Sequence, residues 1–310
     1  MGSACRILVS SGNPALDLPD LTDRLRTRLE ELEAAWSRFR QESEISVLND
    51  HPGLPVLVGP DTLRLTVHAE AAWRLTRGWF DPLMLTELMA LGYDRDHHDL
   101  PAAPPWRPDA STFASEAPLD GRVSRMPEME IDQPLGLVSI PPGTTFDPGG
   151  LGKGLAADML VEEALDHDVD GILVDLGGDI RMAGTWYGNG LWPAIVGHPQ
   201  DRTRDLAEIR LAAGGLATSS LLRRRWQGPA GPVHHVLDPA TAAPAASDVV
   251  AVTVHAGATW FAEAIAKAVL VAGRVAGAAL IEESQTAGMI VDVTGEVDVV
   301  GPLDVRSLTP

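Results

Sequence analysis

The sequence has very little cysteine and a shortage of positive charge. Its one cysteine, Cys5, excludes an internal disulfide framework and a cysteine-rich metal site. Aspartate and glutamate number 43 against 24 lysines and arginines, which gives a net charge of −19. Such a chain lacks the basic face that displaces counterions from nucleic acid, and an anionic membrane surface repels it. We therefore expect no nucleic acid among its partners and no electrostatic docking on a membrane.

Long apolar runs are also absent. No run approaches the roughly 18 residues that suggest a membrane-spanning helix, and residues 1–11 lack the basic and apolar regions of a signal peptide. We therefore expect no membrane span and a cytoplasmic location. Hydrophobic residues nevertheless make up 45% of the 310 residues, which is enough for one large domain or two ordinary ones.

Lysine is almost missing from the chain. Lys153 and Lys267 are the only lysines among the 24 basic residues, and all the others are arginines. A bias of this kind is typical of genome composition. Because there are only two lysine ammonium groups, the position of each in the sequence can be considered individually.

Helix and strand patterns alternate irregularly along the chain. Apolar residues at three- and four-residue steps predict helices at 21–36, 61–77 and 258–273, and residues 147–165 are expected to form a glycine-rich turn that feeds a further helix. Apolar and alternating segments predict strands at 4–10, 135–140, 171–184 (two strands), 191–199, 207–219, 249–256 and 287–300, the last a hairpin around Thr294-Gly295. The mixture favours an α+β fold over regular βαβ winding. Prolines at 101–120 indicate a loop or insertion.

Three details of the helices are expected as well. Asp20 is suited to cap the first helix, and Gly78 and Gly273 are suited to end the second and the last. The apolar face of the second helix is expected to comprise Leu63, Val67, Ala71 and Leu75.

The segment from Asp147 to Gly154, DPGGLGKG, can cradle a ligand. Its glycines allow close backbone approach, the following helix presents free N–H groups, and the Lys153 ammonium suits a phosphate. The spacing departs from a Walker A loop and from the dinucleotide fingerprint. An ordinary helix start with a solvent-exposed lysine is an equally good interpretation. Gly177-Gly178 marks either a close backbone approach or a plain turn between strands.

Two further segments also have two interpretations. His235 could be an oriented base near Asp238, or either His234 or His235 could form only a structural hydrogen bond. Adjacent histidines in a strand point to opposite faces, so a shared metal ion is disfavoured. The arginines 223–225 form either an anion patch or a solvated face. Glu263 and Lys267, four residues apart on a helix, suggest a surface ion pair.

In order along the chain, eight short motifs resemble those of the ApbE-type flavin transferases, which move FMN from FAD onto a protein hydroxyl. They are Met1-Gly2-Ser3, SRFRQESEISVLN (37–49), GWFDP (78–82), DPGGLGKGLAAD (147–158), VDLGGDIRMAG (174–184), GGLATSS (214–220), HHVLDPATA (234–242) and AEAIAK (262–267). The resemblance extends to about residue 273 and is weak over 94–130.

The resemblance implies a fold, an activity and a substrate. The fold is α+β and T-fold-like, with mixed and antiparallel sheets and packed helices in one domain over 1–310. The activity is transfer of FMN from FAD to a threonine or serine of a target protein, with release of AMP and with Mg²⁺ as cofactor. His235 is the implied base. The implied FAD-binding residues are Met1, Phe39, Trp79, Phe80, Asp81, Asp147, Lys153, Gly177, Gly178, Asp179, Thr218, Ser219, His235, Val236 and Leu237.

The metal site departs from the family pattern. The resemblance assigns the metal to the Gly150 carbonyl and to the helix segment that contains Glu263 and Ala266. Lys267 stands where the family has a threonine ligand, and a charged lysine has no lone pair to donate. One hypothesis is a transferase in which the Lys267 ammonium partly replaces Mg²⁺ in catalysis. The alternatives are an FAD-binding protein without transferase activity and an enzyme that hydrolyses FAD to FMN and AMP.

Overall fold

The computed structural model describes residues 4–104, 124–186 and 190–308. A seven-stranded sheet lies at its centre, in the order β1-β5-β6-β9-β12-β13-β14, and every neighbouring pair is antiparallel. Its strands are β1 (Cys5–Ser10), β5 (Gly171–Leu176), β6 (Asp179–Gly184), β9 (Gly214–Ser220), β12 (Val249–Ala256), β13 (Ala287–Asp292) and β14 (Val297–Val300). The predicted α+β class with antiparallel strands is confirmed.

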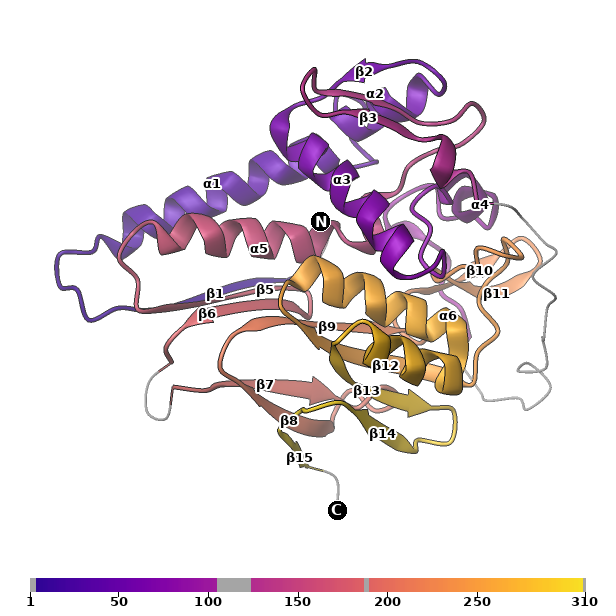
Figure 1. The fold of residues 1–310 in the computed structure, drawn as a ribbon. Helices are drawn as coiled ribbons and strands as arrows, with labels where there is room; N and C mark the ends of the chain where they lie inside the picture. Colours follow the sequence, from indigo (N-terminus) through magenta and orange to yellow (C-terminus); the bar gives the residue numbers. More distant parts are fainter. Residues whose placement is uncertain (1–3, 105–123, 187–189, 309–310) are drawn as a thin grey trace.

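Helices cover one face of this sheet, and a smaller sheet covers the other (Figure 1). The helices are α1 (Leu18–Trp36), α5 (Gly152–Leu165) and α6 (Thr259–Glu283), with α3 (Pro60–Leu75) packed beyond them. The smaller sheet has the order β15-β8-β7, with strands β7 (Trp192–Gly197), β8 (Asp205–Leu211) and β15 (Val305–Ser307). The fully buried Trp192 packs with Met182 and Leu216 between the two sheets.

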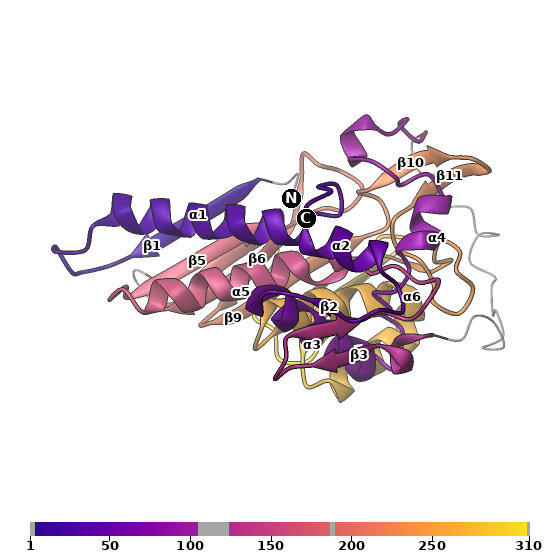
Figure 2. The same ribbon diagram turned by 90° about the horizontal axis from the view of Figure 1, so that it is seen from above.

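The remaining elements lie around the end of the helical layer, as the view from above shows (Figure 2). They are α2 (Glu44–Asp50), β2 (Val56–Leu57), α4 (Leu85–Ala90), β3 (Glu130–Asp132), β4 (Leu137–Ser139), β10 (Arg225–Gly228) and β11 (Gly231–His234), with the short 3₁₀ turns η1 (His97–Asp99), η3 (Met126–Glu128) and η4 (Pro148–Gly150). Most of the predicted proline-rich insertion, from residue 105 to 120, lies outside the described residues.

Two helix details differ from the sequence predictions. The first helix is capped by Asp17, whose Oδ1 accepts a hydrogen bond from the Asp20 backbone N–H at 3.1 Å, so Asp20 is the third residue of the helix. Helix α3 buries Thr62, Leu65, Thr66, Ala69 and Ala72 in place of the predicted apolar face. Threonine can be buried there because Thr62 accepts a hydrogen bond from Trp36 and Thr66 donates to its own helix backbone.

Helix α6 passes the predicted end at Gly273. Gly273 has a φ of +80°, which breaks the helix, and helical backbone resumes from Arg274 to Glu283. By length and composition α6 is the one described helix that could cross a membrane, but half of its most apolar stretch is buried inside the fold. It packs against β9 and β12, with Ala262, Ile265 and Val269 fully buried.

The start of α6 is fixed by α5. Ala258, at the cap position of α6, offers no side-chain hydrogen bond, and the Asp158 carboxylate of α5 accepts instead from the backbone N–H groups of Thr259 and Trp260, at 2.9 and 3.0 Å. The two helices can approach closely because residue 154 is a glycine. A Cβ atom at Gly154 would lie only 2.7 Å from the Thr259 backbone. This contact sets α5 and α6 side by side at the functional site.

Candidate active site

A cavity of about 860 Å³ opens where the helical layer, the central sheet and the β10–β11 hairpin meet. Its lining comes from the turn after α1, the segment around Trp79–Pro82, η1, η4, the start of α5, the β5–β6 turn, the loop before β10, the segment after β11 and the middle of α6. Small-molecule sites commonly have volumes of roughly 300–1,000 Å³, so this one suits a large ligand.

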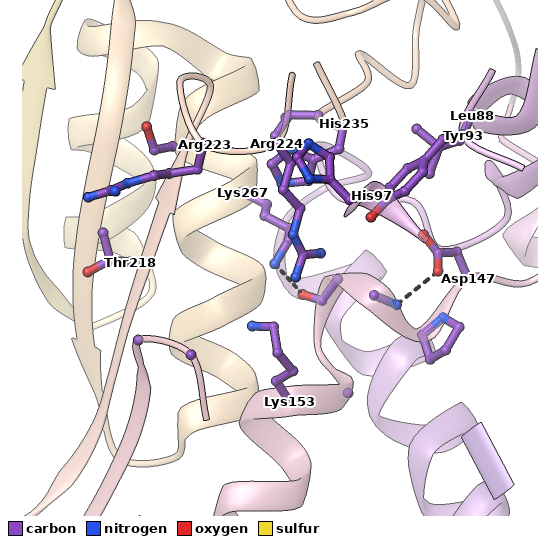
Figure 3. Close-up of a pocket in the computed structure, with 18 of the residues that line it drawn as sticks. Leu88, Tyr93, His97, Asp147, Lys153, Thr218, Arg223, Arg224, His235 and Lys267 are labelled. Carbon is purple, nitrogen blue, oxygen red and sulfur yellow. Dashed lines mark hydrogen bonds between the residues drawn. The ribbon is translucent and has the colours of Figure 1, made fainter. Parts of the chain in front are cut away.

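The glycine-rich segment before α5 forms one side of the cavity (Figure 3). The Asp147 carboxylate caps η4 by accepting from the Gly149 backbone N–H at 3.0 Å. The Asp147 backbone N–H donates to the Pro82 carbonyl at 2.8 Å, which joins this segment to the Trp79–Pro82 segment. Two motifs far apart in the sequence therefore line one wall.

Aromatic side chains occupy the adjoining wall. Trp79 and Phe80 line the cavity from the segment after α3, and Phe39 lines it at an exposed position. The Arg38 guanidinium lies over the rings of Phe39 and Tyr93, at 4.4 and 4.5 Å from their centroids. This wall offers flat apolar surfaces on which a ring system can stack.

Both lysines of the chain meet on one carboxylate oxygen. Glu263 Oε1 accepts a hydrogen bond from Lys267 Nζ at 2.9 Å and one from Lys153 Nζ at 3.3 Å. Its other oxygen, Oε2, accepts from the Gly154 backbone N–H at 2.8 Å. Lys153 also forms an ion pair with Asp179, and Lys267 donates to the Gly150 carbonyl at 3.1 Å (Figure 3).

This lysine–carboxylate cluster, formed by Lys153, Asp179, Glu263 and Lys267, is shielded from solvent. The Glu263 side chain is 1% exposed, and those of Lys153 and Lys267 are 17% and 15% exposed. The interpretation of Glu263 and Lys267 as a surface pair is wrong, because α6 packs against the central sheet beside α5, and both side chains are shielded there. Lys153 is likewise not the solvent-exposed residue of the simpler interpretation.

Two pKa values in this cluster, those of Lys153 and Glu263, are lowered, each for a different reason. Burial lowers the pKa of Lys153 to about 8, aided by Lys267 and Arg224 and opposed by Glu263. Burial alone would raise the pKa of Glu263, but Lys153 and Lys267 outweigh it and bring that pKa to about 2. Glu263 is therefore ionised at neutral pH and Lys153 is predominantly charged.

Arg224 and His235 face this cluster from the β10–β11 side (Figure 3). The Arg224 guanidinium forms no ion pair with any residue in the described part of the chain. Burial, with the positive charges of Arg224 and Lys267, holds the pKa of His235 well below its usual value. The imidazole is therefore neutral at pH 7 and able to accept a proton.

The arginines 223–225 do not act as one solvated face. Arg223 and Arg224 line the cavity, whereas Arg225 donates to the Pro104 carbonyl at 3.1 Å. His234, next to His235, is a structural histidine: its ring nitrogens contact the Ala245 carbonyl at 3.2 Å and the Val236 backbone N–H at 3.3 Å.

Gly177 and Gly178 form the two-residue turn between β5 and β6. Their φ values are +71° and +99°, which a β-hairpin turn of this length requires and which glycine adopts freely. Both line the cavity, so the turn is also a close backbone approach.

A model of the ApbE family matches residues 1–301. The chain belongs to the ApbE family. Among curated relatives, the FAD:protein FMN transferase of Treponema pallidum is 28% identical over 295 residues, which are 91% of this chain and 80% of that protein. The FAD:protein FMN transferase of Vibrio cholerae is 25% identical over 290 residues, 92% of this chain and 83% of the relative.

Solved ApbE structures share the fold. An ApbE protein from Thermotoga maritima superposes with a TM-score of 0.81 at 26% identity, covering 96% of this chain and 94% of that one. The flavin transferase ApbE from Vibrio cholerae has a TM-score of 0.77 at 24% identity, covering 97% and 94%. The predicted ApbE-type architecture, with antiparallel sheets and packed helices, is confirmed.

The structure places most of the ApbE-like residues in the cavity wall. Phe39, Trp79, Phe80, Asp81, Asp147, Gly150, Lys153, Gly177, Gly178, Thr218, His235, Val236, Leu237 and Lys267 all line it. Four other predicted residues lie behind the lining: Asp179 and Glu263 contact Lys153, Ser219 alternates in β9 with Thr218 and Ser220, and Ala266 is fully buried. Met1 lies outside the described residues.

Several residues that line the cavity were not predicted from the sequence to bind a ligand. Tyr93 lies directly before the stretch where the ApbE resemblance is weak and His97 lies inside it, whereas Ser220 is the last residue of the GGLATSS motif. The Nε2 atom of His97 is buried and has no hydrogen-bond partner among the described residues. The only signal for Arg224 was its place in the arginine run.

The residues implied to hold Mg²⁺ do not fit a metal ion. The Gly150 carbonyl and Glu263 Oε1, two of the implied ligands, are both hydrogen-bonded to Lys267 Nζ. Within the described ranges, no group of three or more histidine, cysteine, aspartate or glutamate side chains could hold a metal. The place of the third ligand is taken by an ammonium, which repels a cation.

Proposed function

We propose that this ApbE-family chain is an FAD:protein FMN transferase, which moves the FMN half of FAD onto a threonine or serine hydroxyl of a target protein and releases AMP. The observation that carries the proposal is one cavity lined by the cationic side chains of Lys153, Lys267 and Arg224 and also by the aromatic wall described above. FAD suits such a cavity, because its anionic pyrophosphate can bind the cationic side chains and its two flat ring systems can stack on the aromatic ones.

The cationic side chains suit the pyrophosphate. In a shielded site, positive charges stabilise the negative charge that develops on the phosphoryl oxygens more strongly than they would in water. Backbone N–H groups at the start of α5 point in the same direction as the helix dipole and favour an anion there as well. Trp79 and Phe80 offer ring faces to the flavin or the adenine.

In the proposed reaction the acceptor hydroxyl oxygen attacks the phosphorus of the FMN half. A new phosphorus–oxygen bond forms to the acceptor, and the bond from that phosphorus to the bridging oxygen breaks. The bridging oxygen leaves with AMP. The hydroxyl proton passes to a base, and His235 is the candidate because it lines the cavity as a neutral imidazole.

Substrate binding would adjust this base. The pKa of His235 is held down by burial and by the charges of Arg224 and Lys267. A bound pyrophosphate offsets both charges and therefore raises the pKa of the imidazole toward neutrality, where proton transfer is most effective. The base thus becomes stronger when FAD is in place.

The test is an incubation of the protein with FAD and a candidate acceptor that contains threonine or serine. The expected products are AMP, measured by chromatography, and an acceptor carrying one FMN, measured by intact mass. We expect His235→Asn to lower the transfer rate by a factor of about 10²–10⁴, the usual contribution of a positioned base.

His234→Asn is the matched control, because this neighbouring imidazole forms structural hydrogen bonds and lies outside the cavity lining. It should keep the transfer rate within about threefold of the unmodified protein if the protein remains folded. Equal rates for the two variants would contradict the assignment of His235, and FAD turnover without any FMN-modified acceptor would contradict the transferase.

A further inference from the structure

We propose that the Lys267 ammonium is a built-in cation of this site, which stands in place of a metal ion and holds the FAD pyrophosphate together with Lys153 and Arg224. The inference rests on the proposed function, because it concerns how the same cavity binds FAD. It predicts a flavin transferase that works without Mg²⁺.

The first observation is the pair of oxygens that Lys267 contacts. Its Nζ lies 3.1 Å from the Gly150 carbonyl oxygen and 2.9 Å from Glu263 Oε1. A backbone carbonyl and a carboxylate are the oxygen ligands that a hard cation such as Mg²⁺ prefers. An ammonium has three donors, and two of them bind these oxygens. Lys267 also lines the cavity, so the third donor is left for a ligand.

The second observation is that both carboxylate oxygens of Glu263 already accept hydrogen bonds, which leaves little capacity to bind a metal ion. Oε1 accepts from both lysines, and Oε2 accepts from the Gly154 backbone N–H at 2.8 Å. Mg²⁺ requires oxygens at about 2.0–2.1 Å in near-octahedral geometry. An ion on the Gly150 and Glu263 oxygens would lie beside the Lys267 ammonium and be repelled by it.

The third observation is the balance of charge. Lys153, Lys267 and Arg224 bring three positive charges, and the two carboxylates among them are Asp179 and Glu263. Arg224 forms no ion pair in the part of the chain that the structure describes. The site therefore keeps an unpaired positive charge for an anionic ligand. A lysine carries one charge where magnesium carries two, and Arg224 supplies the second.

The experiment measures FAD and metal binding separately from catalysis. FAD affinity is measured by quenching of flavin fluorescence in excess EDTA and again in Mg²⁺. Binding of Mn²⁺ as a probe for the metal site is measured by electron paramagnetic resonance, with and without FAD. For the unmodified protein we expect FAD dissociation constants within twofold in the two buffers and no stoichiometric Mn²⁺ site.

Lys267→Thr restores a hydroxyl at this position and removes the internal cation. We expect it to bind FAD at least tenfold more weakly in EDTA, and to recover affinity and gain one Mn²⁺ site when metal is supplied. The double variant Glu263→Asp with Lys267→Thr restores the shorter carboxylate as well. Circular dichroism and thermal melting check that both variants are folded.

Arg74→Thr is the matched control. Arg74 also pairs with a glutamate four residues away on a helix, at 2.6 Å from Glu70, but its side chain is 67% exposed and is not part of the cavity lining. This variant should have the same FAD affinity as the unmodified protein, and that affinity should be the same in EDTA and in Mg²⁺.

The outcomes separate the inference from the proposed function. A stoichiometric Mn²⁺ site in the unmodified protein, or FAD binding that requires Mg²⁺, would overturn the inference. So would the lack of any metal response in both folded Lys267 variants. Metal-free FAD binding that depends on Lys267, without formation of an FMN-modified acceptor, would support the inference about Lys267 and contradict the proposed transferase activity.

Discussion

Two clusters of charged side chains in this molecule differ in their balance of positive and negative charge. In the lysine–carboxylate cluster, one glutamate oxygen accepts from two lysines, and Arg224 adds a further positive charge nearby. Around Arg274, one guanidinium contacts three carboxylates, those of Asp292, Glu296 and Asp298, at 2.5–3.1 Å. The two lysines of the first cluster line a cavity and are shielded, whereas Glu296 in the second cluster is 63% exposed.

The difference shows which cluster is built for a ligand. The Arg274 cluster joins the segment after the Gly273 break to the β13–β14 hairpin and contains more negative than positive charge. The hydrogen bonds that Arg274 donates to Asp298 and Glu296 raise the pKa of Arg274, so this guanidinium stays charged. Together with Arg224, the lysine–carboxylate cluster has three positive charges against two negative charges in a shielded site, where an anion gains most from the excess positive charge.

The largest expected effect follows from removing the shared carboxylate. Glu263→Gln leaves two lysines close together in a shielded site without the anion between them. We expect it to lower the free energy of unfolding by about 3–5 kcal/mol, the cost of breaking a buried charge network. Urea denaturation measures the loss, and Asp298→Asn in the Arg274 cluster is the control. A loss no larger than that of Asp298→Asn would show that the two clusters are energetically alike.

Removing the unpaired cation tests the charge surplus directly. Arg224→Met should weaken FAD binding by about 10- to 100-fold, because a charge-assisted bond in a shielded site stabilises by roughly 1.5–3 kcal/mol. It should leave the melting temperature nearly unchanged, since Arg224 forms no ion pair with the described residues. A variant that melts earlier and still binds FAD normally would assign Arg224 a structural role.

The pH dependence of FAD binding should follow Lys153. Its pKa is about 8 in the folded protein against an ordinary value of 10.5, so the ammonium loses its proton as the pH rises through 8. FAD affinity should then fall by about fivefold between pH 8 and pH 9, as the protonated fraction of Lys153 drops. The free energy of unfolding should rise over the same interval, because the unfolded chain keeps this proton to higher pH.

Titration calorimetry across pH 6.5–9.5 measures the affinity, and Lys153→Met provides the comparison. That variant should bind FAD weakly with a flat profile over this range. An equally steep decline in Lys153→Met would assign the titration to another group.

The smallest effect is expected at the exposed cluster. Arg274→Met should lower the melting temperature slightly, and the difference should shrink as salt rises from 0.05 to about 1 M, because exposed ion pairs are screened. FAD affinity should stay within twofold. Calorimetric melting and flavin fluorescence check both statements, and a loss of FAD binding would contradict the separation of the two clusters.

Much of the fold and of the cavity was predictable from the sequence. Local patterns located the strands and helices because apolar periodicity and glycine turns act over short distances, as in the Gly177-Gly178 turn between β5 and β6. The short motifs of the ApbE family gave most of the cavity wall, from Phe39 to Leu237. Each motif holds its residues within one turn or strand end, so its members stay together in the fold.

The remaining features depend on contacts between distant segments. The pairing of Glu263 with Lys153, 110 residues apart, follows from the close approach of α5 to α6 at Gly154, which no local pattern reveals. The buried face of α3 depends on Trp36 of α1 in the same way. Tyr93 and His97 reach the cavity from a segment without recognisable motifs. Helix α6 resumes after Gly273 although glycine usually ends a helix.

The role of Lys267 as a built-in cation is tested most directly by measuring the intact mass of an acceptor after incubation with this protein and FAD in excess EDTA. We expect an acceptor that carries one FMN, with an equal amount of AMP, because Lys153, Lys267 and Arg224 supply the cations. An FMN-modified acceptor that forms only after Mg²⁺ is added would contradict the claim that lysine stands in place of the metal.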